Sequence, residues 1–351
     1  MITSEEPLTF KFHWMDEQGQ PAGFLRKKGA FDGTTLQLAE HEIPALALLD
    51  VTARDERMVV SVPLEDGQVH GLGLVLTSKK IAERLKTALD IARSGTWAEQ
   101  HREELAKEGR GHAYRHEICP QCSATVILSD MPETPQIFCP YCQALSFAGE
   151  SERNVRAADY RICDECGMFS KPRRFTIFYF YFLLVVYGWQ TRTTWRCPAC
   201  MRPDAWKMLA GNLPFVLGVP VAATQLVRAY GGGAGGGPFA GLDAGNRAAR
   251  AGNFSLAIAK YREILERQGH AAGVKYNLGL ALLNQKDMRR ATEAFEISLA
   301  DCANYVPAYY QLRGLYTELG EEAKLARLTA MWGEAEDAGE LIEDGGVPQE
   351  V

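Results

Sequence analysis

Eight of the nine cysteines occur as four Cys-x-x-Cys pairs, and this feature constrains the fold more than any other. A Cys-x-x-Cys turn presents two thiolates from one tight loop, and two such turns complete the tetrahedral site that zinc prefers. A reducing compartment would keep these thiolates available for a metal. The sequence therefore predicts two structural zinc ions with eight ligands. The predicted ligands are Cys119, Cys122, Cys139, Cys142, Cys163, Cys166, Cys197 and Cys200.

The spacing of the pairs favours one set of partners and leaves another open. Sixteen residues separate Cys122 from Cys139, which suits a zinc ribbon made of two adjacent hairpins. Thirty residues separate Cys166 from Cys197, so a second site of this kind would contain a long insert. We predict pairing in chain order. The 20 residues after Cys142 would also fit a ribbon, and the outer pairs would then meet in a cross-braced site.

Two zinc ribbons are thus predicted, at residues 118–150 and 151–206. Such small units cannot bury enough apolar surface alone, so the metal supplies much of their folding energy. The pairs also resemble those of rubredoxin, where four thiolates hold a redox-active iron. Gly167 follows one pair as in that family, but Met201 follows another, so an iron-based electron carrier is the weaker hypothesis. Cys302 stands apart and is expected to be a small buried residue.

The insert in the second ribbon contains a run without charge at residues 175–189. As a helix it would be about 22 Å long, short of a hydrocarbon core of about 30 Å. If one ion ties both ends together, the run must also return to the side from which it started. Basic residues flank it on both sides, which suits the anionic cytoplasmic face of a membrane. These flanking residues are Lys171, Arg173, Arg174, Arg192 and Arg196.

An apolar segment that interrupts a zinc ribbon resembles the membrane-anchoring zinc domain of the LITAF family. The resemblance covers Cys163 to Cys200 and implies an insert that dips into one leaflet. It departs from the family at residues 194–196, where the family has a histidine before its last cysteine pair. The alternative is a long β-ribbon packed on the rest of the protein. The residues expected to meet lipid are Phe175, Phe178, Phe180, Phe182, Leu183, Leu184 and Trp189.

A second uncharged stretch, Met208 to Val227, lies within the predicted segment 207–229. It is long enough to span a bilayer, but Pro214 and Pro220 make a straight helix unfavourable. We predict a kinked hairpin at the membrane interface, with a full span as the alternative.

The first 96 residues predict a β-rich domain. Short alternating runs between residues 8 and 78 indicate strands, and an apolar stripe over residues 79–94 indicates a helix that Gly95 ends. This order resembles the pleckstrin-homology-like fold, an antiparallel sheet closed by a C-terminal helix. Three basic residues, 26–28, suit either a lipid headgroup or a solvated hairpin rim. Residues 97–117 are predicted to be a charged connector.

The C-terminal third predicts a tethered helical array. Residues 230–237 are rich in glycine and form a flexible linker, and residues 238–339 repeat with a period of 34. Gly245 aligns with Gly279, and Tyr261 with Phe295. The period resembles the tetratricopeptide repeat, whose groove binds a peptide or a helix of a partner protein. The resemblance assigns partner contacts to Asn246, Arg250, Tyr276, Asn284, Tyr310 and Thr317. Residues 340–351 predict an acidic disordered tail.

Together these features predict a multidomain α+β protein that acts as a non-enzymatic scaffold or adaptor. The N-terminus shows no secretory signal, so we expect a cytoplasmic protein, peripheral or monotopic on the inner face of the membrane. No nucleophile elbow, phosphate loop or open metal site is present in the sequence, so neither catalysis nor a small-molecule substrate is predicted. The alternative is nucleic-acid binding, because residues 153–228 carry 11 basic and 4 acidic side chains in a chain of net charge −6. The aromatic residues there cluster in the uncharged run, which favours lipid over bases.

Overall fold

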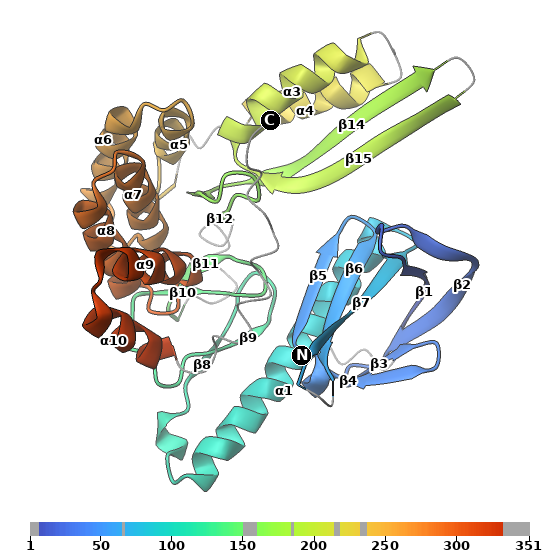
Figure 1. Ribbon diagram of the computed structural model, residues 1–351, viewed down its shortest axis with the longest axis horizontal. Coiled ribbons are helices and arrows are strands. Elements are labelled where there is room, and N and C mark those ends of the chain that lie inside the picture. Colours follow the sequence, from blue (N-terminus) through green and yellow to red (C-terminus); the bar gives the residue numbers. More distant parts are fainter. Residues whose placement is uncertain are drawn as a thin grey trace.

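The computed structural model describes residues 7–64, 67–149, 160–183, 186–213, 218–231 and 237–332, and for residues 180–183 and 186–191 it describes only the backbone. The predicted tail, most of the linker (232–236) and Leu184 lie outside these ranges. Along the chain come an antiparallel sheet with a long helix, three short hairpins, a long hairpin with two helices, and a helical array (Figure 1). This is the multidomain α+β architecture that the sequence predicts.

The first domain is a seven-stranded antiparallel sheet. Its elements are β1 (Leu8–Met15), β2 (Pro21–Phe31), β3 (Thr35–Leu38), β4 (His41–Pro44), the 3-10 turn η1 (Ala45–Ala47), β5 (Asp50–Arg54), β6 (Arg57–Pro63) and β7 (Val69–Leu76). The order is β4-β3-β2-β1-β7-β6-β5, so β1 joins two meanders by pairing with β2 and β7. Side chains that alternate along the strands, such as Phe12, Leu36 and Met58, form one buried core. The resemblance to a named fold family stays a prediction.

A long helix, α1 (Lys79–Lys107), closes this core. The prediction that it ends at Gly95 is wrong. A glycine inside a helix costs only about 1 kcal/mol relative to alanine, and the burial of Ala98 and Leu105 beyond it offsets that cost. The predicted connector at 97–117 is therefore helical as far as Lys107, and α1 reaches past the sheet toward the cysteine-containing hairpins (Figure 1).

Three short hairpins follow α1 and the 3-10 turn η2 (Gly111–Ala113). They are β8 (His116–Ile118) with β9 (Thr125–Ile127), β10 (Gln136–Phe138) with β11 (Leu145–Phe147), and β12 (Arg161–Ile162) with β13 (Phe169–Ser170). Each ladder joins only two or three residue pairs. Two-stranded hairpins of this length are not stable alone, so other contacts must hold them.

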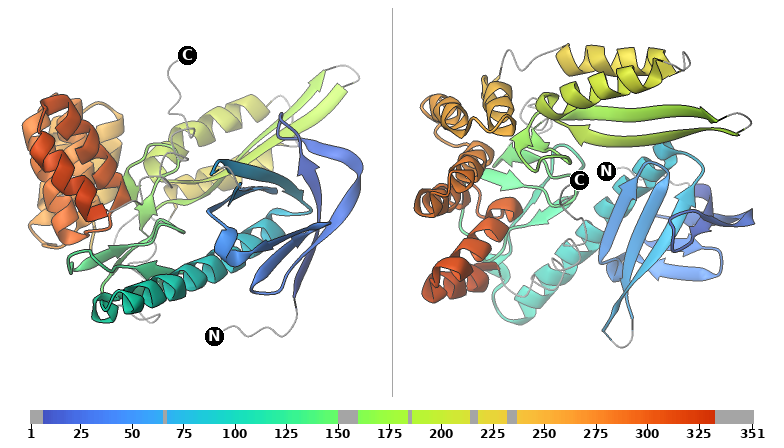
Figure 2. Two further views of the ribbon diagram at one scale, coloured as in Figure 1. Left: turned by 60° about the horizontal axis from the view of Figure 1, so that its bottom comes forward. Right: turned by 45° about the horizontal axis from the view of Figure 1, so that its top comes forward.

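The uncharged segments form one two-layer module (Figures 1 and 2). Its elements are β14 (Arg173–Leu183), β15 (Val186–Arg196), α3 (Pro198–Asn212) and α4 (Val219–Tyr230). The insert is therefore the β-ribbon of our alternative, with the helices packed on it. The prediction that Phe175 faces lipid is wrong, because this side chain is fully buried against Met201 and Met208, and Phe178 packs half-buried on the same core. Helix α3 ends at Asn212 and α4 begins at Val219.

The C-terminal region is a stack of three helix pairs within residues 237–332. The helices are α5 (Leu242–Arg250), α6 (Phe254–Leu265), α7 (Ala272–Asn284), α8 (Met288–Asp301), α9 (Val306–Leu319) and α10 (Glu322–Trp332). The sequence period is visible in the packing. A Cβ at Gly245 would lie 2.6 Å from the Tyr261 ring, and one at Gly279 would lie 2.5 Å from the Phe295 ring. Glycine at the aligned positions thus lets paired helices approach.

Candidate metal centres and the surface that holds them

The eight paired cysteines form two clusters of four sulfur atoms. Within each cluster all sulfur atoms lie within 4.8 Å of one another. Four sulfur pairs lie within hydrogen-bond distance: Cys119 with Cys142 and Cys122 with Cys139, both at 3.6 Å, Cys163 with Cys200 at 3.8 Å, and Cys166 with Cys197 at 3.9 Å. Pairing in chain order is confirmed, and the cross-braced alternative is wrong.

Three of the four pairs share one backbone design. The N–H of the first cysteine donates to the carbonyl five residues on, and the residue after the second cysteine donates back to the carbonyl of the first. Ser123, Gln143 and Gly167 occupy that last position, at φ values of 63°, 60° and 66°. This left-handed conformation turns the chain so that both sulfur atoms face the same point.

The fourth pair opens a helix instead. Cys197 is the N-cap of α3, and Pro198 follows in the first turn, where a missing N–H leaves nothing unsatisfied. Met201, which departs from the rubredoxin pattern, continues the helix and is fully buried. The Cys197 N–H donates to the Cys163 sulfur at 3.2 Å. A helix N-terminus favours negative charge, so this design also stabilises thiolates.

The four thiols of each cluster are coupled by hydrogen bonds, so some pKa values rise while others fall. Bonds to Cys119 raise the pKa of Cys122 and Cys139, and bonds to Cys163 raise the pKa of Cys197 and Cys200. Hydrogen bonds from the three other thiols, that of Cys122 first, hold the pKa of Cys119 far below its ordinary value. The same effect, led by Cys166, lowers the pKa of Cys163. Four largely buried, soft donors at this spacing fit a thiophilic ion such as Zn²⁺ or iron in a closed tetrahedral site. The residues present therefore fit a structural metal ion.

The first cluster is tied to α1 through Tyr141, which lies inside the second cysteine pair. The Arg93 guanidinium lies 4.9 Å from the centre of the Tyr141 ring, and Lys86 donates to the Tyr141 carbonyl at 3.4 Å. Burial raises the pKa of Tyr141 to about 12. Asp90 pairs with both cations, and burial raises its own pKa. These contacts join the first cluster to the N-terminal domain.

Next to each cluster, the helical array forms hydrogen bonds with the main chain of one phenylalanine. Asn277 donates through Nδ2 to the Phe169 carbonyl at 2.7 Å, and its Oδ1 accepts the Phe169 N–H at 2.8 Å. Asn304 makes the same pair of bonds with Phe138, at 2.7 and 2.9 Å. All four residues are buried. We call these two-point contacts the asparagine clamps.

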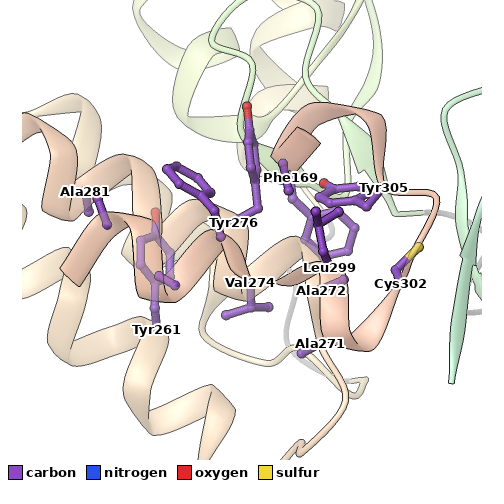
Figure 3. Close-up of a cluster of buried hydrophobic side chains, with 14 of the residues drawn as sticks. Phe169, Tyr261, Ala271, Ala272, Val274, Tyr276, Ala281, Leu299, Cys302 and Tyr305 are labelled. Atoms are coloured by element: carbon purple, nitrogen blue, oxygen red, sulfur yellow. The ribbon is translucent and has the colours of Figure 1, made fainter. Parts of the chain in front are cut away.

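The Phe169 ring occupies a space that the array leaves open at Gly273. A Cβ at that position would lie 2.2 Å from the ring. Asn246 donates to the Phe169 carbonyl at 2.9 Å and accepts a hydrogen bond from the Tyr261 hydroxyl at 2.9 Å. Figure 3 shows Phe169 among the buried side chains of the array. The core of the array therefore includes the hairpins of both clusters.

The predicted partner-binding residues fall into two groups. Asn246 and Tyr276 belong to the buried surface that faces the hairpins, with Asn246 bonded to Phe169. The other four are exposed or half-buried. These are Arg250, Asn284, Tyr310 and Thr317. Part of the predicted groove is thus already filled by the chain itself.

The module of the second cluster also rests on the N-terminal domain. Asp55 accepts the Thr193 N–H of β15 at 3.1 Å and pairs with Lys79 of α1 at 3.0 Å. Burial alone would raise the pKa of Asp55, but these donors lower it below its ordinary value. Arg174 of β14 pairs with Glu83 of α1 at 2.8 Å. The base of the module is therefore fixed to the sheet and to α1.

The charges of the module are confined to that base. Residues 175–191 and 208–227 contain no charged residue. The β14–β15 ladder begins at the base, where Arg173 lies opposite Arg196, and its last pair is Leu183 with Val186. Helices α3 and α4 lie along this ribbon (Figure 2). The uncharged stretches therefore lie together at the end of the module that is farthest from the base. We call this far end the charge-free end.

Apolar side chains of α3 and α4 are exposed along the module. Leu213 is 63% exposed and Val227 is 71% exposed. Trp206 and Tyr230 lie nearer the base, where the indole Nε1 donates to the Tyr230 hydroxyl at 3.1 Å. Leu213 directly follows the end of α3, far from the base, whereas Val227 lies close to Tyr230 and directly before Arg228.

Sequence reasoning did not single out the residues that hold the clusters. Phe138 directly precedes Cys139, and Phe169 follows Cys166 by three residues, so an aromatic residue next to each cluster was a usable signal. No sequence pattern near Asn277 or Asn304 indicates their role, since each bonds a residue more than 100 positions away.

No model of a known protein family matches the chain, and a search of curated proteins found no match. Among the residues that the structure describes, no helix is both long and apolar enough to cross a bilayer. The fold and the clusters define the class: a multidomain α+β protein with two four-cysteine sites, which are compatible with zinc ribbons, and a C-terminal helical array.

Proposed function

We propose that the protein is a non-enzymatic scaffold stapled by two zinc ions. The observation that carries this proposal is that each cluster of four sulfur atoms joins hairpins too short to be stable alone, and that the array holds these hairpins through the asparagine clamps. A closed site of four thiolates contributes folding energy and leaves no position for a substrate. Zinc at both sites would therefore connect the N-terminal domain, the module and the array.

Elemental analysis of protein purified without chelators tests the metal. We expect about two zinc ions per chain and no absorption in the visible range, because Zn²⁺ has a filled d shell. Iron in either cluster, or protein that loses no stability when the metal is removed, would contradict the proposal.

We infer further that the array is of the tetratricopeptide type and recruits a partner protein. The 34-residue period, the three helix pairs and the glycines beneath Tyr261 and Phe295 support this inference. Arrays of this type bind a peptide or a helix along their first helices. The residues Arg250, Asn284 and Thr317 are exposed and are candidates for partner contacts.

We also propose that the charge-free end enters one leaflet on the cytoplasmic face of a membrane. The separation of charge along the module supports this, since Lys207 and Arg228 at the base would meet anionic headgroups. The Trp206 and Tyr230 pair would lie at the interface, where such side chains are enriched. The resemblance to the LITAF-type domain implies the same orientation.

Co-sedimentation with anionic vesicles tests this part. The variant Leu213→Asp/Val227→Asp should bind at least about tenfold more weakly than the wild type, because each new charge would have to enter the interface. Its zinc content should not change, since both side chains are exposed and distant in sequence from the ligands. A matched control is Ile297→Asp, which places the same charge at a site on α8 that is 51% exposed. Wild-type protein that stays in the supernatant would contradict membrane binding.

A further inference from the structure

We propose that the inner face of the array is a binding site for an extended strand that contains phenylalanine, and that metal in the second cluster keeps this site closed by holding the chain's own β13 in it. The proposal rests on the proposed scaffold function and adds the regulation of its groove.

The chemistry of the site defines its ligand. Asn277 bonds both the backbone N–H and the carbonyl of one residue, and Asn246 donates to the same carbonyl. Any extended strand has these main-chain groups available for such bonds. The space at Gly273 accepts the ring of that residue, because a Cβ there would lie 2.2 Å from the Phe169 ring. Main-chain bonds thus provide affinity, and the ring pocket provides the preference for phenylalanine.

A second example in the same molecule supports this ligand class. Asn304 holds Phe138 through the same two bonds, and the Phe138 ring packs on Tyr305 with its centre 5.3 Å away. Two strands of unrelated sequence, one before a cysteine pair and one after, are therefore bound in the same way. The array recognises main chain plus one aromatic ring, and not one particular sequence.

The second cluster explains why the chain's own strand occupies the site. The ladder of β12 and β13 has two residue pairs, Arg161 with Ser170 and Ile162 with Phe169. Such a ladder cannot hold its shape alone. Metal ties Cys163 and Cys166 to the start of α3 and so fixes β13 opposite Asn277. Without metal, β13 becomes a tethered flexible strand that an external strand can displace.

The first cluster is less suited to such exchange. Its hairpin is also tied to α1 through Tyr141, and Asn304 lies in the connection between α8 and α9. Asn246 and Asn277 lie on α5 and α7, the first helices of their pairs, where arrays of this type bind partners. The strand-binding site at Asn277 is therefore the one that loss of metal from the second cluster opens to a partner.

A labelled peptide with the sequence of residues 160–171, carrying Cys163→Ser and Cys166→Ser, is the probe. Its fluorescence anisotropy is measured with full-length protein loaded with zinc, with protein stripped by a chelator, and with the Cys197→Ser variant. We expect metal loss to tighten peptide binding at least about tenfold, because β13 then no longer blocks the binding site on the array. Phe169→Ala in the peptide should remove binding.

Variants of the protein test the recognition itself. Asn277→Ala in the stripped protein should weaken peptide binding at least about tenfold, since the strand loses both of its bonds to Asn277. The matched control is Gln285→Ala, an exposed amide at the end of the same helix, whose side chain bonds Ser255. This control should leave peptide binding unchanged.

Three outcomes would overturn the proposal. Equally tight binding of the peptide by zinc-loaded and stripped protein would show that metal does not close the site. Stripped protein that keeps its helical circular dichroism but does not bind would show that the face is not a site. Loss of helicity on stripping would show that metal holds the array itself. In each case, two zinc ions per chain and binding to vesicles would leave the scaffold proposal standing, whereas absence of zinc would refute both.

Discussion

The two cysteine clusters have the same ligands and differ in what lies between their pairs. In the first, 16 residues between Cys122 and Cys139 form short strands, whereas in the second, 30 residues between Cys166 and Cys197 form a long ribbon that leaves the site. Because three cysteine pairs lie in tight turns and the fourth at the start of α3, the chain between the pairs of one cluster can lengthen at little cost. Each doubling of a flexible loop costs only about 0.6 kcal/mol of closure entropy. A metal site of this kind can therefore carry a separate module.

The clusters also differ in their neighbours. The first is held between α1, through Tyr141, and the array, through Asn304. The second is held by Asn277 on the array, while its module touches the sheet at Asp55. Both hairpins contact the array, and the first cluster is in addition packed on α1 through Tyr141. Damage to the first cluster should therefore spread to the N-terminal domain, and damage to the second should spread to the module.

Removal of one ligand is expected to have the largest effect and to separate the clusters. Cys119→Ser and Cys163→Ser should each lose one of two ions and lower the free energy of unfolding by about 5 kcal/mol or more, because metal binding provides the folding energy of such units. Elemental analysis and urea unfolding measure both quantities. Cys302→Ala is the control, since Cys302 lies outside both clusters and should leave both ions in place. A ligand variant that keeps two ions would refute the assignment.

Removal of a clamp compares how strongly the array holds each hairpin. Asn277→Ala should lower the free energy of unfolding by about 3 kcal/mol, because the buried Phe169 N–H loses its acceptor and the Phe169 carbonyl keeps only its bond from Asn246. Asn304→Ala should lower it by about 2 kcal/mol, because both bonds to the buried Phe138 main chain are lost. The larger effect follows from the additional bond between Asn277 and Asn246, at 3.0 Å. Asn284→Ala is the control on α7, whose exposed amide bonds only the Leu280 carbonyl, and it should change stability by less than about 0.5 kcal/mol. If all three variants unfold alike in urea, the clamps do not hold the hairpins.

An added methyl group at Gly273 tests only the contact between the array and the β12–β13 hairpin. Gly273→Ala should destabilise the protein by about 2 kcal/mol, because the new Cβ overlaps the Phe169 ring. The double variant Gly273→Ala/Phe169→Ala should cost less than the sum of the single changes. Gly314→Ala is the control in α9, where no heavy atom lies within 4 Å of the new Cβ, and alanine there should stabilise the helix by up to about 1 kcal/mol. Strict additivity in thermal unfolding would show that the ring does not occupy this space.

The smallest expected effect concerns the contact between the module and the sheet. Asp55→Asn should cost about 1 kcal/mol at pH 7, because a charged acceptor is lost from Thr193 and Lys79. The folded pKa of Asp55 lies below its ordinary value of 3.8, so this contribution is complete above about pH 4 and is lost as the pH falls through the folded pKa. The difference in stability between wild type and variant should therefore shrink on acidification. A difference that does not depend on pH would contradict the role of the carboxylate.

Sequence patterns predicted the parts whose signals are local. The cysteine spacing predicted both sets of ligands, and the 34-residue period aligned Gly245 with Gly279 and Tyr261 with Phe295, which occupy equivalent places in the structure. The form of the insert was not decided by its composition, because an uncharged aromatic run suits either a strand buried on one face or a segment in lipid. The partners of Phe169 and Phe138 lie 108 and 166 positions away, and no local pattern encodes such a distance. The length of α1 depended on burial beyond Gly95, which only the tertiary fold provides.

The asparagine clamps also imply an order of events while the chain is being made. Asn277 follows Phe169 by 108 residues, so translation at roughly 5 to 20 residues per second separates them by about 5 to 20 s. During that interval the hairpins have left the ribosome or are leaving it, and the array that will cover them does not yet exist. Metal can then reach the thiolates from open solvent. Once α7 and α9 have folded over the hairpins, an ion that arrives late must enter sites that are already enclosed.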